Sequence, residues 1–311
     1  MSPRAALGRL PVAVSHPDKV FWPTEGYTKL DLVRFYDRIF PHLRPYVAGR
    51  LLTLERCPDG LRGQCFYQRE APRGMPAATP TKRVRDATGT TTYVVGGRRD
   101  TQAALTNLGC IAVHVWGSRA AAPRRPDWVC FDLDPTSGEF ADAARAGQRV
   151  RTEMTALGLT SFPKTSGSRG LHVFVPLRAG PDVDEVLAFA EAVVRHIAAR
   201  HPDELTVESR IAARRGRVYL DPFRNGYAQT VAAPFSVRRR PKAPVSTPLD
   251  WSEVTPRLRP ERFNLGNFEH RLSGGDPWEA FFRSRQTLSR ALNALRAEER
   301  TERRRQTERE T

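Results

Sequence analysis

The hydrophobic and polar positions in the first third of the chain predict one helix and several short strands. Between residues 28 and 40, apolar residues recur every three or four positions, and Thr28 is placed to cap the helix that this spacing predicts. Apolar runs at 51–56, 64–67 and 91–95 are typical of short strands. Because Ala71–Gly89 is rich in Pro, Gly, Thr and basic residues, we expect a loop or an extended arm there.

From residue 111 onward, strand patterns and helix patterns alternate. Strands are expected at 111–116, 128–132, 171–177, 205–207 and 218–220, and helices at 138–158 and 183–199. This alternation predicts an α/β core of α+β-like character. A Pro- and Arg-rich stretch at 238–248 ends the core, and the aromatic and leucine residues of 276–300 predict one or two helices that pack back.

These patterns predict a single domain over residues 1–300. We expect an N-terminal module at about 1–110, the α/β core at about 111–250, and packing helices at 251–300. A charged, frayed tail is expected at 301–311.

The charge of the chain indicates a class of partner. Fifty Lys and Arg against 34 Asp and Glu give a net charge of +16. Arg296–Thr311 holds six Arg and five Glu, a net charge of +1, which leaves +15 for the rest of the chain. A chain this basic favours a large polyanion, with nucleic acid as the first candidate. The alternative is a compositional bias towards arginine that has no role in binding.

Membrane and secreted classes are disfavoured by the sequence. No apolar stretch approaches the roughly 20 residues of a spanning helix, and the first residues lack the apolar core of a secretion signal. We therefore expect a soluble, cytoplasmic protein with no membrane partner.

The four cysteines (Cys57, Cys65, Cys110 and Cys130) form no C-x-x-C pair. Neither disulfides nor structural zinc are expected, and Cys110 and Cys130 are predicted to be reduced core thiols.

Acidic residues at predicted strand ends are the strongest chemical signal. Asp132 and Asp134 end an apolar run, and strand alternation places both side chains on one face. Asp221 ends a second run and is likewise followed by Pro. Three such carboxylates suit two Mg²⁺ or Mn²⁺ ions for phosphoryl or nucleotidyl transfer. The alternative is a turn in which Asp134 caps the next helix.

Two basic features accompany these acids. Ser166, Arg169 and His172 lie in a Ser- and Gly-rich turn, where backbone N–H groups can approach an anion. Arg210, Arg214, Arg215, Arg217 and Arg224 flank Asp221. Arg238 and Arg240, if they lie on a strand, point the same way and form a clamp for a triphosphate. The alternatives are a flexible turn, a core histidine and a solvated run of charge.

Together these motifs resemble the archaeo-eukaryotic primase superfamily, and in particular the polymerase domain of bacterial ligase D and its stand-alone relatives. The resemblance extends from about Ser15 to Trp251. It implies an archaeo-eukaryotic primase fold, with an RRM-like catalytic core and a smaller N-terminal module. It also implies a template-dependent nucleotidyltransferase that uses two Mn²⁺ or Mg²⁺ ions and prefers ribonucleotides among NTP and dNTP substrates. Such enzymes fill gaps and extend 3′ ends at DNA breaks.

The resemblance also implies residue roles. Asp132, Asp134 and Asp221 match the catalytic metal-binding triad. Nucleotide binding is implied for His114, Ser166, Arg169, His172, Arg214, Arg224, Arg238 and Arg240, and many relatives have Lys where this chain has Arg169. Contacts with a downstream 5′-phosphate are implied for His16, Lys19 and Lys29. Phe66 and Tyr67 match an aromatic pair, usually Phe-Phe, that stacks on the template.

The resemblance leaves the biological role open. The chain has no Lys-x-Asp-Gly ligase motif, and its length leaves no room for further domains, so we expect a stand-alone polymerase. Its expected partners are gapped or broken double-stranded DNA and a separate DNA ligase, with Ku as a further candidate. Non-homologous end joining and excision-repair gap filling both fit. A non-catalytic DNA-end-binding module that recruits a ligase, and a nuclease that uses the same metals, are the alternatives.

Overall fold

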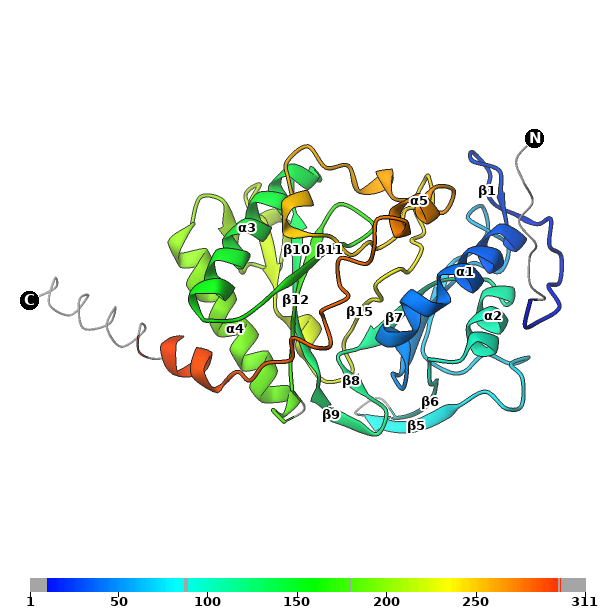
Figure 1. Cartoon of the computed structure of the whole chain (residues 1–311), viewed down its shortest axis with the longest axis horizontal. Coiled ribbons are helices and arrows are strands. Elements are labelled where there is room, and N and C mark those ends of the chain that lie inside the picture. Colours follow the sequence, from blue (N-terminus) through cyan, green and yellow to red (C-terminus); the bar gives the residue numbers. More distant parts are fainter. Residues whose placement is uncertain (1–9, 87–88, 179, 296, 298–311) are drawn as a thin grey trace, which may run out of the picture. The chain divides into compact units, whose positions relative to one another are not determined.

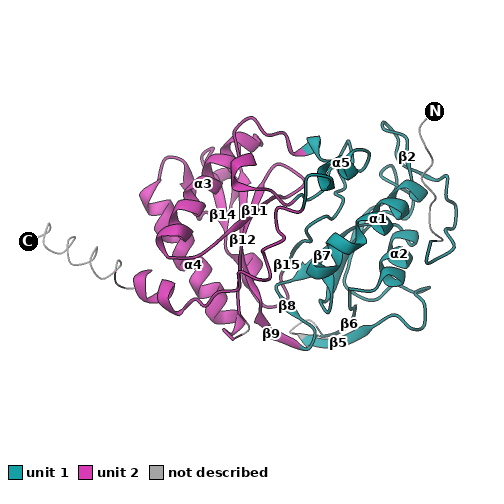
Figure 2. Ribbon diagram, viewed as in Figure 1, with its two compact units in different colours: residues 1–121, 230–247, 261–275 teal, residues 122–229, 248–260, 276–311 magenta. Residues whose placement is uncertain are grey.

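The computed structural model describes residues 10–86, 89–178, 180–295 and 297. The chain forms two compact units that interleave in sequence (Figure 2). The first unit comprises residues 1–121, 230–247 and 261–275, and the second comprises residues 122–229, 248–260 and 276–311. Mixed α/β structure, as predicted, is present in both units.

The first unit is organised around a four-stranded antiparallel sheet. The strand order is β15 (Thr230–Ala232), β7 (Cys110–Trp116), β3 (Leu52–Arg56) and β4 (Phe66–Gln68). Every residue of β7 is buried, which explains its uninterrupted apolar sequence. The sequence prediction grouped this strand with residues 111–250, whereas the structure pairs it with β3 and β15.

The longest helix of the first unit is α1 (Lys29–Val47), which is accompanied by α2 (Arg99–Asn107) and α5 (Phe268–Leu272). Thr28 caps α1 in a capping box with Asp31, which confirms the predicted helix start. The helix runs beyond the predicted end at residue 40, and it includes Pro41 and Pro45. The sequence signals gave no indication of α2.

Small two-stranded elements complete the first unit. They are the pair β1 (Val20–Trp22) and β2 (Tyr27–Thr28), and the hairpin β5 (Thr81–Asp86) and β6 (Gly89–Val94); β8 is Ser118–Arg119. Of the two alternatives predicted for 71–89, the loop is wrong over the second half of the segment. Thr81–Asp86, which contains three basic residues, pairs with β6 in an extended hairpin there, although the composition resembles that of a loop.

The second unit contains a five-stranded sheet. The strand order is β11 (Phe162–Thr165), β12 (Leu171–Pro176), β10 (Trp128–Pro135), β14 (Val218–Asp221) and β13 (Leu205–Thr206). All neighbours are antiparallel except β13 and β14. The strand β9 (Ala122–Pro126) also belongs to this unit, as do short 3-10 turns at Ile211–Ala213, Phe223–Asn225 and Trp251–Glu253. A fourth such turn, Pro260–Arg262, begins in this unit and ends in the first.

Both long helices of the second unit, α3 (Phe140–Ala156) and α4 (Val183–Arg200), pack on the five-stranded sheet and on each other (Figure 1). Gly147 of α3 shows how closely they approach, because a Cβ built there would collide with Leu171 of β12. Leu171 and Leu133 therefore face the helices. Since neighbours in a strand point to opposite sides, Asp132, Asp134 and His172 face away from them.

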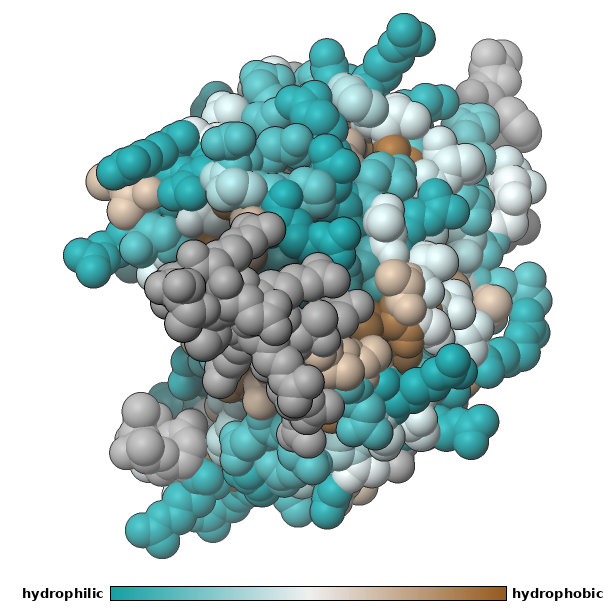
Figure 3. Space-filling model, turned by 90° about the vertical axis from the view of Figure 1, so that its left-hand side faces the viewer, coloured by the Kyte–Doolittle hydropathy of each residue, from teal (hydrophilic) through white to brown (hydrophobic). Residues whose placement is uncertain are grey.

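Aromatic residues late in the chain pack on the same unit, as predicted for 276–300. Trp278 and Phe281 are buried, lie parallel to each other, and contact Phe174 of β12. Turns occupy most of 276–284, and a helix covers 289–295 within the described residues. The predicted tail at 301–311 lies outside the described residues. On the face drawn in Figure 3 most side chains are hydrophilic, which agrees with the high charge.

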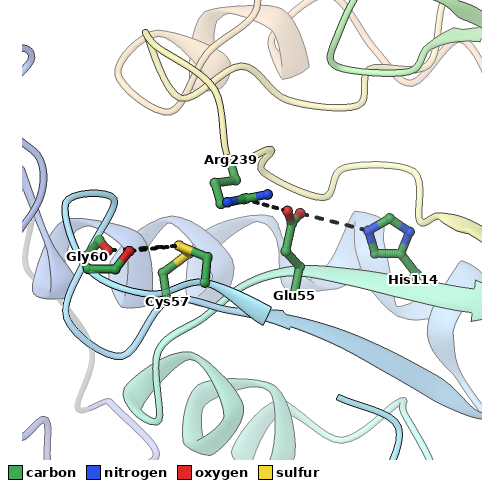
Figure 4. Close-up of a disulfide and its surroundings, with 7 residues drawn as sticks. Glu55, Cys57, Gly60, His114 and Arg239 are labelled. Carbon is green, nitrogen blue, oxygen red and sulfur yellow. Dashed lines mark hydrogen bonds and ion pairs between the residues drawn. A yellow bond between two sulfur atoms is a disulfide. The ribbon is translucent and has the colours of Figure 1, made fainter. Parts of the chain in front are cut away.

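One sequence prediction about the cysteines is wrong. Cys57 and Cys65 form a disulfide (Figure 4). The intervening loop turns tightly through Gly60, whose φ is +74°, and brings the two Cα atoms to 4.3 Å. A spacing of eight residues with no C-x-x-C motif does not reveal this return of the chain. Cys110 and Cys130 are buried free thiols, as predicted.

Candidate active site

The predicted acidic residues gather where three strands of the second unit lie side by side. In the register of the sheet, Asp132 on β10 lies opposite His172 on β12 and opposite Asp221 on β14. Directly opposite residues of antiparallel strands point to the same face, so the three side chains form a row. His172 Nε2 lies 3.3 Å from Asp132 Oδ1.

Arg224 bridges two carboxylates of this row. Its Nε lies 3.2 Å from Asp132 Oδ2 and 3.2 Å from Asp221 Oδ2. The short turn that carries Arg224 is anchored by Asn225, whose side-chain oxygen accepts from the Cys130 N–H at 2.8 Å. The Asn225 amide nitrogen donates to Cys130 O and to Pro222 O, both at 2.7 Å. This buried amide therefore fixes the turn against the strand that bears Asp132.

Asp134 occupies the next position on the same face, two residues further along β10. It pairs in register with Tyr219 of β14. The Arg214 guanidinium lies 4.4 Å from the centre of the Tyr219 ring. The structure thus brings Arg214 close to the acids, as the sequence predicted.

The three carboxyl groups differ in pKa, because their electrostatic surroundings differ. Although burial opposes its ionisation, His172 and Arg224 hold the pKa of Asp132 well below its usual range. Burial and the charge of Asp132 together raise the pKa of Asp134 to about 7. Burial, with a smaller contribution from Asp132, also raises the pKa of Asp221. The row therefore holds more negative charge than its cationic neighbours neutralise.

The donor atoms fit a hard divalent cation in kind. Carboxylate oxygens are the ligands that Mg²⁺ and Mn²⁺ prefer, and Asp132, Asp134 and Asp221 present them on one face of the sheet. Within the described ranges, no three His, Cys, Asp or Glu side chains are gathered as a preformed metal site. Arg224 provides the cationic contact to Asp132 and Asp221 instead.

The Ser- and Gly-rich turn connects β11 to β12 beside this row. Ser166 Oγ accepts from the N–H groups of Ser168 and Gly170, each at 3.2 Å, so the hydroxyl shapes the turn. A Cβ built at Gly170 would lie 2.5 Å from Leu133 O, which requires glycine at this approach to β10. Arg169 lies over the loop after β10, close to Gly138.

His114 lies on β7 in the first unit, within a second cluster of polar groups (Figure 4). Its Nε2 faces Glu55 Oε2 at 4.0 Å, and its ring meets the edge of Tyr67 with 5.4 Å between centroids. Arg239 Nε donates to Glu55 Oε1 at 2.8 Å. Burial opposes ionisation of Glu55, but His114, Arg238 and Arg239 lower its pKa to about 2.

The strand predicted to carry Arg238 and Arg240 is not formed. The chain turns over 238–243, where Arg238 N donates to Pro244 O and Arg240 N donates to Arg238 O. Lys242 and Ala243 adopt positive φ values in this turn. Strand alternation therefore does not apply, and the clamp that it suggested lacks its geometric basis. Arg239, which the sequence reasoning passed over, makes the contact with Glu55.

The residues matched to a 5′-phosphate site lie near the start of the first unit. Lys29 is buried, and its Nζ donates to Ser15 Oγ at 3.0 Å and to Asn107 O at 2.9 Å. Lys19 Nζ pairs with Asp59 at 2.8 Å. Lys29 N donates to Lys19 O at 2.8 Å, so the two residues are neighbours at the backbone, and burial and the charge of Lys19 lower the pKa of Lys29. His16 is exposed and adopts a positive φ.

Phe66 and Tyr67 are both exposed, at 40% and 58%. They are consecutive residues of β4, so they point to opposite faces of the sheet. Tyr67 shares the face of His114, and Phe66 lies under the guanidinium of Arg56, 5.6 Å from its ring centre. The structure does not place the two rings together as one platform.

Three residues of these clusters were missed by sequence reasoning, namely Glu55, Asn225 and Arg239. Glu55 gave no signal, because it shares the polar side of the strand with Thr53 in the sequence pattern, whereas both faces of Leu52–Glu55 are buried in the structure. Asn225 and Arg239 gave none, because a single polar residue in a turn is usually solvated.

Comparisons with known proteins show the family to which this chain belongs. The family described as "LigD, primase-polymerase domain" matches residues 28–278. The multifunctional non-homologous end joining protein LigD of Pseudomonas aeruginosa is 32% identical over 297 residues, covering 90% of this chain and 34% of that protein. The bifunctional LigD of Bacillus subtilis is 28% identical over 286 residues, covering 90% of this chain and 46% of that protein.

A solved structure gives the same result at the level of the fold. The polymerase domain of Mycobacterium tuberculosis ligase D, in complex with DNA, matches with a TM-score of 0.82 and 28% identity. The match covers 89% of this chain and 100% of that domain. The chain thus spans a whole polymerase domain but only 34% and 46% of the two curated relatives. The predicted primase-type fold is confirmed.

No helix in the part of the chain that the structure describes is long and apolar enough to cross a membrane.

Proposed function

Because this chain belongs to the LigD primase-polymerase family, we propose that it is a DNA-directed nucleotidyltransferase that fills gaps and extends 3′ ends during DNA repair. The observation that carries this proposal is the row of His172, Asp132 and Asp221, with Asp134 beside it. A DNA-binding protein without catalysis has no use for buried carboxylates on a basic chain, since they repel phosphates.

Asp132, Asp134 and Asp221 are the residues that would hold two divalent ions, Mn²⁺ in preference to Mg²⁺. When bound, such ions neutralise phosphate charge and activate the primer 3′-OH. His172 orients the Asp132 carboxylate through their 3.3 Å contact. Arg224, Arg214 and the turn that carries Ser166 and Arg169 supply cationic and N–H groups for the triphosphate.

His114, Arg238 and Arg240 are proposed as further nucleotide-binding residues, by the same family resemblance. Positioning and charge neutralisation supply most of the catalysis in phosphoryl transfer, so the chain needs no nucleophile of its own. The family resemblance supports a preference for ribonucleotides.

The proposed substrate is gapped or broken DNA with a downstream 5′-phosphate. Lys19 and Lys29, joined by the backbone hydrogen bond from Lys29 N to Lys19 O, are proposed to bind that phosphate together with His16. Tyr67 and Phe66 are proposed to contact the template, from opposite faces of β4. The nick left after filling requires a DNA ligase, and end joining in a bacterial cytoplasm, with Ku, is the proposed setting. Excision-repair gap filling remains the second proposed role.

Primer extension on a gapped, 5′-phosphorylated DNA with Mn²⁺ tests the proposed function. The unmodified chain should extend the primer, and Asp132→Ala should lower the rate by at least about 100-fold, as the loss of a key charged group at a reacting centre does. Gapped-DNA binding should persist. Glu279→Gln is the matched control, because Glu279 is an exposed carboxylate paired with Arg283 in the same unit. Extension by Asp132→Ala at the wild-type rate would refute the proposal.

A further inference from the structure

Glu55 stands out among the side chains that the proposed mechanism does not use. It is an acidic residue in the middle of a sheet, with a side chain only 4% exposed. On β3 it lies opposite Ala112 of β7 and opposite Tyr67 of β4. A buried carboxylate is costly unless cations and hydrogen bonds compensate it, so its retention at this position calls for a role.

The two oxygens of Glu55 face two different groups (Figure 4). Oε1 accepts from Arg239 Nε at 2.8 Å, and Oε2 faces His114 Nε2 at 4.0 Å. These partners come from distant parts of the chain, since His114 lies on β7 and Arg239 lies in the turn at 238–243. One buried side chain therefore connects the central strand to the arginine-rich turn.

The same face also carries the exposed Tyr67. Its ring meets His114 edge-on at 5.4 Å, and its hydroxyl environment includes Glu55, Arg238 and Arg239. Glu55 thus lies beneath two groups with proposed contacts to substrate, a histidine for the nucleotide and a tyrosine for the template. Its own burial prevents it from touching either substrate.

We propose that Glu55 is a positioning residue that holds His114 and Arg239 in place for nucleotide binding. This inference rests on the proposed function and deepens it. The fixed negative charge orients the imidazole from one oxygen and the guanidinium from the other. Removing the charge while keeping the shape leaves both groups free to adopt other rotamers, which weakens nucleotide binding more than it slows the chemical step.

Glu55→Gln is the decisive variant, because it keeps the volume and removes the charge. The KM for ATP should rise by roughly 10- to 150-fold, the range set by a hydrogen bond to a charged group. The kcat should change by less than about threefold, which separates a positioning role from general damage. Glu269→Gln is the matched control, since Glu269 is a 62% exposed carboxylate paired with Arg38 in the same unit.

Arg239→Gln tests the same inference by changing the more exposed partner of the ion pair. We expect this variant to fold, because the Arg239 side chain is 43% exposed. It should raise the KM for ATP in the same direction. An unchanged KM in Glu55→Gln would overturn the inference, as would an unchanged KM in Arg239→Gln if Glu55→Gln does not fold.

Calorimetric titration of ATP, without DNA, keeps this inference distinct from the proposed function. If the unmodified chain binds ATP but extends no primer, the proposed function fails, and weaker ATP binding by Glu55→Gln still supports a positioning role. Equal ATP affinity in the two proteins would overturn the inference, and no ATP binding by the unmodified chain would overturn both.

Discussion

Replacement of Asp134 by asparagine should stabilise the metal-free protein while it abolishes activity. Asp134 is enclosed at the end of β10, where burial and the charge of Asp132 raise its pKa to about 7. The charge of Asp221 also raises the pKa of Asp134, whereas the charges of Arg224 and Arg214 lower it. At pH 8 the carboxyl is ionised in an environment that disfavours its charge.

The sign of the pH dependence follows from proton binding. The folded chain keeps a proton on Asp134 up to about pH 7, whereas the unfolded chain releases it near the ordinary value of 3.8. The free energy of unfolding therefore falls as pH rises through this window. A pKa raised from 3.8 to about 7 corresponds to roughly 4 kcal/mol, and we expect about 1–4 kcal/mol because the chain relaxes around the charge.

Urea denaturation in EDTA at pH 5 and pH 8 measures this effect. Asp134→Asn should exceed the wild type in stability by about 1–4 kcal/mol at pH 8 and by less at pH 5. Mn²⁺ should stabilise the wild type at pH 8 much more than the variant, since binding to the folded state alone adds stability. A variant less stable than the wild type at pH 8, or a difference independent of pH, would refute the reasoning.

Three further predictions follow from other contacts. Lys19→Ala should reduce the preference for a gap with a 5′-phosphate over one without; it is a cleaner test than Lys29→Ala, which also breaks bonds to Ser15 and Asn107. Asn225→Ala should cost about 1–3 kcal/mol in urea denaturation, because it leaves backbone groups of Cys130 unpaired, and primer extension should fall with it. Replacing both Cys57 and Cys65 by Ser should cost about 2–3 kcal/mol, as expected for a loop with a sequence separation of 8, and equal stability of oxidised and reduced protein would contradict this.

The acidic row was predictable because its determinants are local. Each aspartate ends an apolar run, and alternation alone places Asp132 and Asp134 on one face. The helix start at Thr28 was predictable for the same reason, since a capping residue and its partner Asp31 lie within one turn. Such features depend on a few consecutive residues, which a sequence displays directly.

The features that escaped prediction depend on pairing between distant segments. The position of β7 in the first unit is set by β15, more than 100 residues later in the chain. The contacts that define the proposed role of Glu55 form only when folding brings Arg239 and His114 to it. The disulfide required the tight turn at Gly60, and the hairpin at 81–94 required a partner strand for residues with loop-like composition.

The acidic row combines carboxylates at strand ends with a cation, Arg224, that a separate turn brings to them. Asp132, Asp134 and Asp221 place three carboxyl groups on one face of the sheet, and the single guanidinium of Arg224 bridges only two of them. That guanidinium is held in position by the Asn225 clamp on Cys130. The row therefore owes its partial neutralisation to this turn as well as to His172 on β12. Asp132 and Asp221 would hold a divalent ion with carboxylate groups that Arg224 also contacts. Arg224 would then supply a cationic group beside the ion for the triphosphate. The arrangement therefore stabilises the empty row while keeping a phosphate-binding group beside it.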